Sequence, residues 1–285
     1  MAAGDERAGS AFERDTSVRL LGDDTYEGSL AGRWWIGRAP NGGYLAAVVL
    51  RALEAALGDP GRAPRSVTVH YLTPPKEGPV TVACRVERAG RALSTLSARM
   101  HQGDRLIALA LAAFSEPWPA DVELDQAAPP DVPPPEALEA PSWERPRFAE
   151  NFDTRHALGA TPFSGAAEAL TGGWIRLNEP QIADDVFVMM LADAWPPAVF
   201  GLVDGFFPVP TVELTVHFRA ALPLAGATAE DFHLVRFQTR LIHDGFLEED
   251  GAIWSRDGQL LAQSRQLALV LPSPGPQRVA GGQPG

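Results

Sequence analysis

Asp193 is the residue whose type and surroundings point most directly to acid–base chemistry. It follows Asp184 and Asp185, which can cap the start of a helix, and precedes Pro196 and Pro197, which would end one. At helical spacing it shares one face with three apolar residues, Val186, Met189 and Met190. Burial raises the pKa of a carboxyl group and makes its carboxylate a stronger base. We therefore predict a general base at Asp193. The structural alternatives are a cap for the turn into Pro196 or an ion pair with an arginine.

A second candidate is the segment Asn41-Gly42-Gly43, which precedes an Ala- and Leu-rich run that closes at Gly58. This pattern predicts a helix over residues 42–57, capped at both ends and largely buried. The first backbone N–H groups of such a helix can polarise a carbonyl oxygen or hold an anion. A tight turn is the alternative reason for the glycine pair.

Other kinds of catalytic or metal site find no support in the sequence. It contains no Gly-x-Ser-x-Gly motif, which argues against an α/β-hydrolase serine. None of the histidines has metal-ligand spacing, and His70 and His217 occupy equivalent strand positions that suggest a structural role. The single cysteine, Cys84, excludes an internal disulfide and alternates with valines as a buried residue would. We expect no metal and no cofactor.

The strand that organises the chain runs from Thr211 to Arg219. Apolar and polar residues alternate along it, which predicts one apolar face made of Val212, Leu214, Val216 and Phe218. The sequence Thr-Val-His-aromatic at residues 215–218 recurs at residues 68–71, within a segment that alternates in the same way. The two segments therefore look like copies of one unit.

The surroundings of the two strands repeat in the same order. Upstream, residues 34–36 precede the helix, and strands are expected at 66–71, 78–88, 90–101 and 105–115. Downstream, residues 174–176 precede a helix at about 185–195, and strands are expected at 211–219, 231–242, 246–256 and 259–271. The composition of 105–115 alone would allow a helix, but its place after the Gly103-Asp104 turn favours a strand. We predict an α+β fold of two tandem units, each a long helix wrapped by a mostly antiparallel sheet.

Proline content sets the expected domain boundaries. Prolines crowd the chain from Glu116 to about Arg147, where no hydrophobic periodicity is visible. We expect an N-terminal unit, a Pro-rich linker, a C-terminal unit and a disordered tail, at residues 16–116, 117–160, 161–272 and 273–285. The polar residues before the first unit are expected to be loose.

Composition limits the partners. Hydrophobic residues make up 45% and charged residues 21% of the 285 residues, as in an ordinary globular protein. A net charge of −12 argues against nucleic acid and anionic membranes. The apolar runs are far shorter than the ~20 residues of a membrane helix. The start of the chain lacks a basic segment followed by an apolar one, so we predict no signal peptide and a cytoplasmic location.

Four segments of the chain resemble those of a known family. They read NGGY at residues 41–44, ADAWPP at 192–197, PTVELTVHFR at 210–219 and AQSRQ at 262–266. From about residue 20 to 271, the chain is similar to the thioesterase-like double-hotdog proteins of the acyl-CoA thioesterase II family. The resemblance implies a double hotdog fold and hydrolysis of acyl-CoA or acyl-carrier thioesters, a reaction of lipid metabolism.

The resemblance also implies roles for individual residues. In that family an Asp, a Thr or Ser and a Gln hold and activate the hydrolytic water, and these positions fall on Asp193, Thr211 and Gln266. Asp193 would take a proton from the water, which the other two side chains hold near the carbonyl carbon. The amides of Gly42 and Gly43, or backbone N–H groups of the second half, would stabilise the oxyanion without a covalent intermediate.

Several positions stay open. The spacing from Asp193 to Thr211 is shorter than in better-known members, so Thr215 is an alternative source of the hydroxyl. It joins Asn41, Gly42 and Gly43 as an expected substrate-binding residue. Gln263 is an alternative to Gln266, although the two point to opposite faces of a strand. The last strand of the first half has no counterpart of Gln266, so only one of the two equivalent sites should be active.

Two other functions fit the same fold. One is a non-catalytic acyl-thioester-binding or scaffold protein, which would bind acyl-CoA without releasing thiol. The other is a hotdog hydratase or dehydratase. Proteins of that kind resemble chains that use a catalytic His together with an Asp. No histidine here lies at a helix start near Asp193. A homo-oligomer that forms through sheet edges is compatible with either function.

Overall fold

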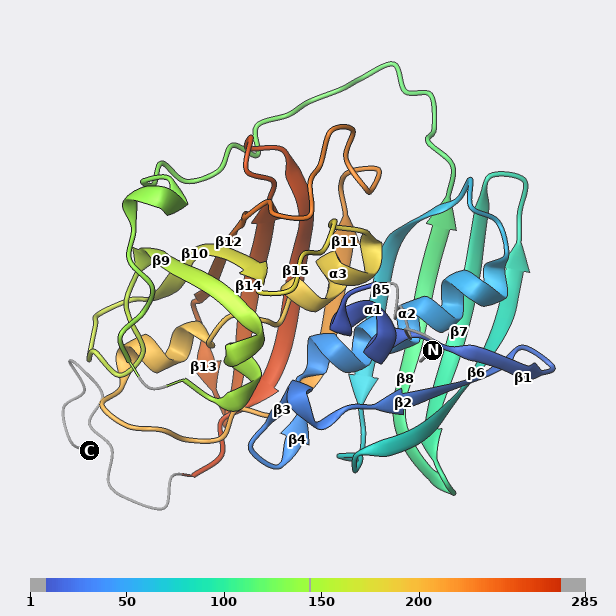
Figure 1. Ribbon diagram of the computed structural model, residues 1–285, viewed down its shortest axis with the longest axis horizontal. Helices are drawn as coiled ribbons and strands as arrows, with labels where there is room; N and C mark the ends of the chain where they lie inside the picture. The colour runs from blue at the N-terminus through green and yellow to red at the C-terminus, as the bar shows by residue number, and fades with distance from the viewer. Residues whose placement is uncertain (1–8, 144, 273–285) are drawn as a thin grey trace, which may run out of the picture.

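The computed structural model describes residues 9–143 and 145–272, and these residues form one antiparallel sheet of 13 strands around two helices (Figure 1). The first half contributes β1 (Arg19–Gly22), β2 (Thr25–Leu30), β5 (Ala63–Tyr71), β6 (Gly78–Ala89), β7 (Leu93–Gln102) and β8 (Arg105–Ser115). The second half contributes β9 (Phe152–Gly159), β10 (Ala169–Leu177), β11 (Thr211–Phe218), β12 (His233–Thr239), β13 (Ile242–His243), β14 (Phe246–Trp254) and β15 (Leu260–Leu269). The strand expected at 105–115 is therefore confirmed.

The two repeated segments lie side by side at the centre of the sheet. Strands β5 and β11 pair antiparallel, with Thr68 directly opposite Thr215 and their hydroxyl oxygens 2.8 Å apart. Outward from this pair, the strand order is β5-β8-β7-β6-β2-β1 on one side and β11-β15-β14-β12-β10-β9 on the other. The two halves are thus related by a pseudo-twofold axis between the two threonines, as the duplication predicted.

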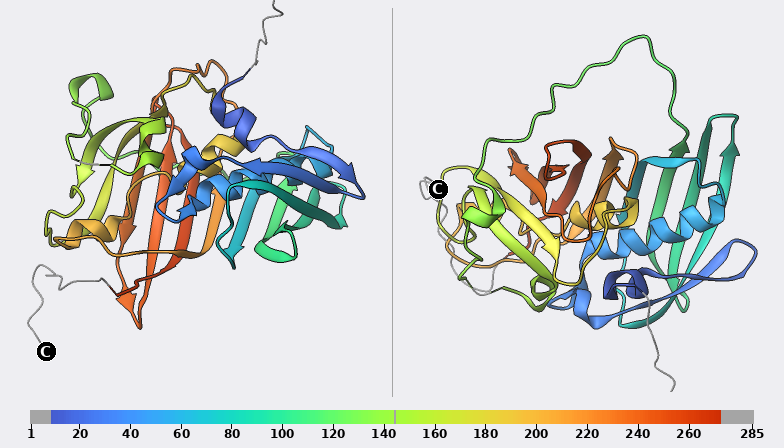
Figure 2. Two further views of the ribbon diagram at one scale, coloured as in Figure 1. Left: turned by 60° about the horizontal axis from the view of Figure 1, so that its bottom comes forward. Right: turned by 45° about the horizontal axis from the view of Figure 1, so that its top comes forward.

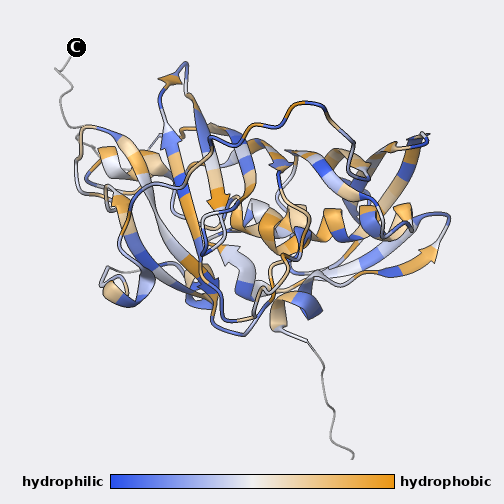
Figure 3. Ribbon diagram, turned by 90° about the horizontal axis from the view of Figure 1, so that it is seen from above, coloured by the Kyte–Doolittle hydropathy of each residue, from blue (hydrophilic) through white to orange (hydrophobic). Residues whose placement is uncertain are grey.

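Two helices cover the same face of the sheet (Figure 2). Helix α2 (Gly42–Leu57) begins after the N-cap Asn41 and ends at Gly58, whose φ of 62° is the left-handed conformation that glycine adopts readily. Helix α3 (Asp185–Leu191) begins after the N-cap Asp184. α2 contacts β5, β6, β7 and α3, and all these elements contribute to one buried core. The hydropathy colouring of Figure 3 shows the long central helix as mostly hydrophobic. An almost wholly apolar helix is stable here because the sheet and α3 cover it.

The remaining elements are short. Helix α1 (Ala11–Thr16) has a capping box between Ser10 and Glu13. Four 3₁₀ helices are η1 (Gly32–Trp34), η2 (Pro135–Ala137), η3 (Arg147–Asn151) and η4 (Ala198–Leu202), and a separate ribbon pairs β3 (Trp35–Ile36) with β4 (Ala39–Pro40). The chain from β8 to η3 arches over one end of the sheet (Figure 1). Of the described helices, none is long and apolar enough to cross a bilayer.

Some expected boundaries need correction. Residues 152–159 of the expected linker form β9, which lies at the edge of the main sheet and pairs with β10. Residues 11–15, expected to be loose, belong to α1, which packs on α2 and β2. Residues 34–36, expected to correspond to residues 174–176 of β10, belong to η1 and the small ribbon. The strand that occupies the position of β10 in the first half of the sheet is β2. The expected tail, 273–285, lies outside the described residues.

The second helix is shorter than the sequence pattern predicts. It ends at Leu191, and Asp193 lies in the turn that follows, where its N–H bonds the carbonyl of Met190 at 3.2 Å. The chain leaves the helix early because Trp195 is buried in the second half, where its ring N–H donates to Thr171 at 3.1 Å. Asp193 is therefore not on a helix face but at the C-terminal end of α3, facing the start of α2.

Candidate active site

Asp193 joins the two halves of the protein at the N-terminus of α2. Its Oδ2 accepts hydrogen bonds from the Gly43 N–H at 3.0 Å and from Asn41 Nδ2 at 2.9 Å. Asn41 Nδ2 also donates to the Asp193 backbone carbonyl at 2.6 Å, while its Oδ1 caps α2 by accepting from the Tyr44 N–H at 2.9 Å. One asparagine thus holds both the helix start and the carboxylate.

The two glycines are explained by how closely α2 and α3 approach. A Cβ on Gly43 would lie 2.6 Å from the Met190 carbonyl oxygen, and a Cβ on Gly42 would lie 3.0 Å from Asp193 Oδ2. No side chain fits at Gly43 without a shift of the backbone. The Asn-Gly-Gly sequence therefore serves the contact between the two helices, beyond the turn that precedes α2.

Burial is the main influence on the Asp193 carboxyl group and raises its pKa to about 6. Hydrogen bonds from the backbone of Gly43 and Gly42 and from the side chains of Gln266 and Asn41 lower the pKa and offset part of this rise. The group is therefore mostly ionised at pH 7 and yet a stronger base than an exposed aspartate. This is the balance that general-base catalysis near neutral pH requires.

Gln266 and Thr211 face Asp193 from the sheet. The Gln266 side-chain amide donates to Thr211 Oγ1, and the same side chain is a hydrogen-bond partner of Asp193. Thr211 reaches this position because β11 is irregular at its start. Thr211 pairs with Ala268 while Glu213 pairs with Leu267, so one extra residue turns the Thr211 side chain to the helix-facing side. The strict alternation expected from the sequence is wrong at this residue.

The alternative residues lie elsewhere. Thr215 is on the other face of β11, where its hydroxyl contacts Thr68 and donates to Glu213. Gln263 is exposed and accepts a hydrogen bond from Arg219 Nε at 2.9 Å, whereas Gln266 is only 9% exposed. The structure therefore makes Gln266 a partner of both Thr211 and Asp193, whereas Thr215 lies on the other face of β11 and Gln263 is exposed.

The expected oxyanion role of Gly42 and Gly43 also needs revision. The Gly43 N–H donates to the carboxylate of Asp193, and the Gly42 backbone contributes to the same interaction. These amides lie at the positive end of the α2 dipole, which favours a nearby negative charge. In this arrangement they stabilise the ionised carboxylate of Asp193, and the Gly43 N–H is not free to bind an oxyanion.

Two residues that sequence reasoning missed lie beside this group. The Tyr71 hydroxyl donates to the Gly42 carbonyl at 2.8 Å; burial, followed by the charges of Asp193 and Glu213, raises the pKa of Tyr71. Glu249 is 5% exposed, and its Oε2 accepts from the Ala198 N–H at 2.6 Å. Both signals were present in the sequence. Tyr71 is the aromatic residue of the first repeated tetrapeptide, and Glu249 is an acid at an apolar position of an alternating strand.

The equivalent place in the N-terminal unit lacks these groups. The β11–β15 pairing places Gln266 opposite Leu214, and the corresponding β5–β8 pairing places Ala112 opposite Val67. A methyl group thus occupies the position of the amide. This agrees with the expectation that only one of the two sites is equipped for catalysis.

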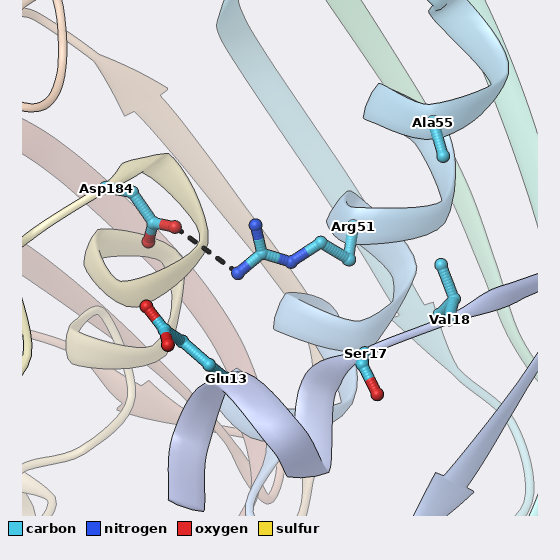
Figure 4. Close-up of a pocket in the computed structure, with 6 residues that line it drawn as sticks. All are labelled: Glu13, Ser17, Val18, Arg51, Ala55 and Asp184. Carbon is cyan, nitrogen blue, oxygen red and sulfur yellow. Dashed lines mark hydrogen bonds and ion pairs between the residues drawn. The ribbon is translucent and has the colours of Figure 1, made fainter. Parts of the chain in front are cut away.

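A cavity of about 370 Å³ lies at the opposite end of α3 from Asp193 (Figure 4). There Asp184, the N-cap of α3, forms an ion pair with Arg51 at 3.3 Å. Asp184 corresponds to Asn41, the N-cap of α2. The cavity is lined by Glu13, Ser17, Val18, Arg51, Ala55 and Asp184. In the described part of the chain, no group of three His, Cys, Asp or Glu side chains is arranged to hold a metal ion.

Comparison with known proteins assigns both halves to one family. Residues 30–115 match the family described as the acyl-CoA thioesterase N-terminal domain, and residues 125–270 match the acyl-CoA thioesterase C-terminal domain. A thioesterase-like protein of the fungus Talaromyces wortmannii, TwmA, is 26% identical, and the match covers 95% of each chain.

Solved structures show the same fold over the same length. A hot dog fold protein of unknown function from Alicyclobacillus acidocaldarius superposes with a TM-score of 0.84 at 25% identity, covering 93% of this chain and 99% of the other. A candidate thioesterase II from Thermobifida fusca has a TM-score of 0.78 at 30% identity, covering 92% and 98%. The chain described here has a double hotdog fold and belongs to the acyl-CoA thioesterase family.

Proposed function

We propose that the protein hydrolyses acyl-CoA or acyl-carrier thioesters at the site formed by Asp193, Thr211 and Gln266. The observation that carries this proposal is the meeting of three groups from distant parts of the chain. A carboxylate with a raised pKa, a hydroxyl and an amide converge where α2, α3 and the sheet come together. General-base hydrolysis needs a base within reach of a water molecule that other polar groups hold in place, and these three groups can supply both.

The reaction follows from their chemistry. Thr211 and Gln266 hold a water molecule, and Asp193 removes its proton as the water oxygen bonds to the thioester carbonyl carbon. The tetrahedral intermediate then collapses, which breaks the carbon–sulfur bond. The proton passes from Asp193 to the departing thiolate, so the products are a free acid and a thiol. The Asn41 and Gly43 donors keep the carboxylate in place and in its ionised form.

The first test compares two glutamines of the same strand. Thiol release is measured on short, medium and long acyl-CoAs and on an acyl-carrier protein, with Gln266→Leu and with Gln263→Leu as the matched control. We expect Gln266→Leu to lower kcat about 100-fold, as removal of a single polar catalytic donor does. Gln263→Leu should retain wild-type turnover because its side chain is exposed on the other face. A wild-type protein that binds these substrates but releases no thiol would instead support the binding or scaffold function.

A further inference from the structure

Glu249 is a buried carboxyl group directly beside the proposed catalytic amide. It lies opposite Gln266 in the β14–β15 pairing, and directly paired residues point to the same face of a sheet. Leu247 and Ile253 on the same face of β14 are buried, and Glu249 between them is only 5% exposed. Gln266 links the two carboxyl groups: it pairs with Glu249 across the sheet and is a hydrogen-bond partner of Asp193, whose charge acts on Glu249.

The hydrogen-bond partner of Glu249 lies in the connection between Asp193 and Thr211. This connection, residues 194–210, contains Pro196 and Pro197, which have no N–H to donate. The next residue, Ala198, begins η4 and donates its N–H to Glu249 Oε2 at 2.6 Å. Because one end of the connection is the proposed base and the other is the proposed hydroxyl, its attachment to the sheet determines how the two approach each other.

Hydrogen bonds to other elements also hold the connection: the Trp195 ring N–H donates to Thr171, and the backbone carbonyls of Phe200, Gly201, Pro208 and Pro210 accept from N–H groups outside the connection. Apolar contacts add to these bonds. Val199, Val203 and Phe207 pack on Leu247 and Ala268 in a small cluster separate from the main core. The bond from Ala198 to Glu249 fixes the connection five residues after Asp193, at the position in the sheet where Glu249 pairs with Gln266.

We propose that Glu249 is a positioning residue for thioester hydrolysis. By holding the Ala198 N–H beside Gln266, it fixes the distances among the side chains of Asp193, Gln266 and Thr211. It touches neither water nor substrate in this role. The inference rests on the proposed function, and it adds to that function a residue that acts through the others.

The protonation of Glu249 gives this role a signature. Burial raises its pKa to about 8; the Ala198 hydrogen bond lowers the pKa, and the charges of Asp193 and Glu248 raise it further. The acid is therefore neutral at pH 7 and ionises as the pH passes about 8. The charged and titratable groups that act on it are Asp193, in the turn after α3, and Glu248, its neighbour in β14. Ionisation places a second negative charge beside Asp193, so kcat should fall above pH 8.

The test uses two Glu249 variants and a double variant, with thiol release measured from pH 6 to 9.5. Glu249→Gln keeps an oxygen for the Ala198 N–H, so we expect near wild-type kcat at pH 7 and loss of the alkaline decline. Glu249→Leu removes the acceptor and should lower kcat by about 10- to 100-fold with little change in KM, since small misplacements of catalytic groups cost that much. In a Gln266→Leu background, Glu249→Leu should have almost no further effect on kcat.

Each contrary result has a distinct meaning. If the wild type is active and Glu249→Leu matches its kcat, or if Glu249→Gln keeps the alkaline decline, Glu249 is not a positioning residue and the proposed function stands. Additive effects of Glu249→Leu and Gln266→Leu would show that Glu249 acts independently of the amide, which also overturns the inference. Absence of thiol release from the wild type overturns the proposed function, and the role of Glu249 with it.

Discussion

Replacement of Asp193 by asparagine removes the proposed base but keeps an oxygen for the hydrogen bonds from Gly43 and Asn41. The hydrogen bonds from the Gly43 N–H and from Asn41 Nδ2 reach the same carboxylate oxygen, Oδ2. The asparagine Oδ1 can take that place, so the contact between α2 and α3 survives. The variant loses the second oxygen and the ability to accept a proton.

The expected loss of rate follows from the role of the group. General-base catalysis contributes about 10²- to 10⁴-fold, so we expect Asp193→Asn to lower kcat/KM by this factor, or by roughly 3–5 kcal/mol of transition-state stabilisation. The wild type should lose about tenfold in kcat/KM per pH unit below the pKa of about 6. The variant should show no decline near that pH.

Stability should change in the opposite direction. Burial raises the pKa of Asp193 in the folded protein from 3.8 to about 6, so folding favours the protonated form. The stability that this group contributes is complete below pH 3.8 and is lost as the pH rises to about 6, a loss on the order of 3 kcal/mol. An asparagine carries no such penalty. At pH 7 the variant should therefore unfold at the same or a higher temperature than the wild type.

The assay combines thiol release, followed with a chromogenic thiol reagent, with thermal unfolding of the same preparations. Reduced turnover in a variant at least as stable as the wild type supports the base assignment. Full turnover of Asp193→Asn refutes it. Reduced turnover together with a large drop in melting temperature refutes the stability reasoning, because it would show that the charge is required for folding.

Two further predictions compare matched variants, and a third concerns the pH dependence of stability. Thr211→Val should lower kcat about 10- to 100-fold. Thr215→Val should change kcat less than about threefold because the Thr215 hydroxyl is on the other face of β11. Similar losses in both variants would contradict the inference that the bulge turns Thr211, and not Thr215, toward Gln266. Gly43→Ala should reduce thiol release by about tenfold or more, because its Cβ would lie 2.6 Å from the Met190 carbonyl, and Gly61→Ala, in an exposed turn, is the control; equal activities would argue against the close helix contact. The melting temperature should be higher at pH 5 than at pH 8. Raised folded-state pKa values of about 8 at Glu249 and Glu54, about 7 at Asp185 and about 6 at Asp193 remove more stability over this window than the lowered pKa of His233, about 4, adds; a melting temperature that rises over this range would contradict the raised pKa values as a set.

The sequence alone determined the parts of this protein that depend on local pattern. Helix α2 was predicted at its observed bounds because Asn41 and Gly58 are caps whose geometry acts within one turn. The strand at 105–115 and the duplicated architecture followed from period-two alternation and from the repeated tetrapeptide, whose two copies pair at the centre of the sheet. These features need only neighbours along the chain.

Only the tertiary structure decided how the candidate site is assembled. Helix α3 stops at Leu191 because Trp195 is held by Thr171 in another strand, and Thr211 turns toward Gln266 because of a bulge against β15. Glu249 acquires its raised pKa from burial among residues far from it in sequence. Periodicity describes which way a residue points within its own element. The distances between side chains from different elements are set by packing, and the chemistry of this site depends on those distances.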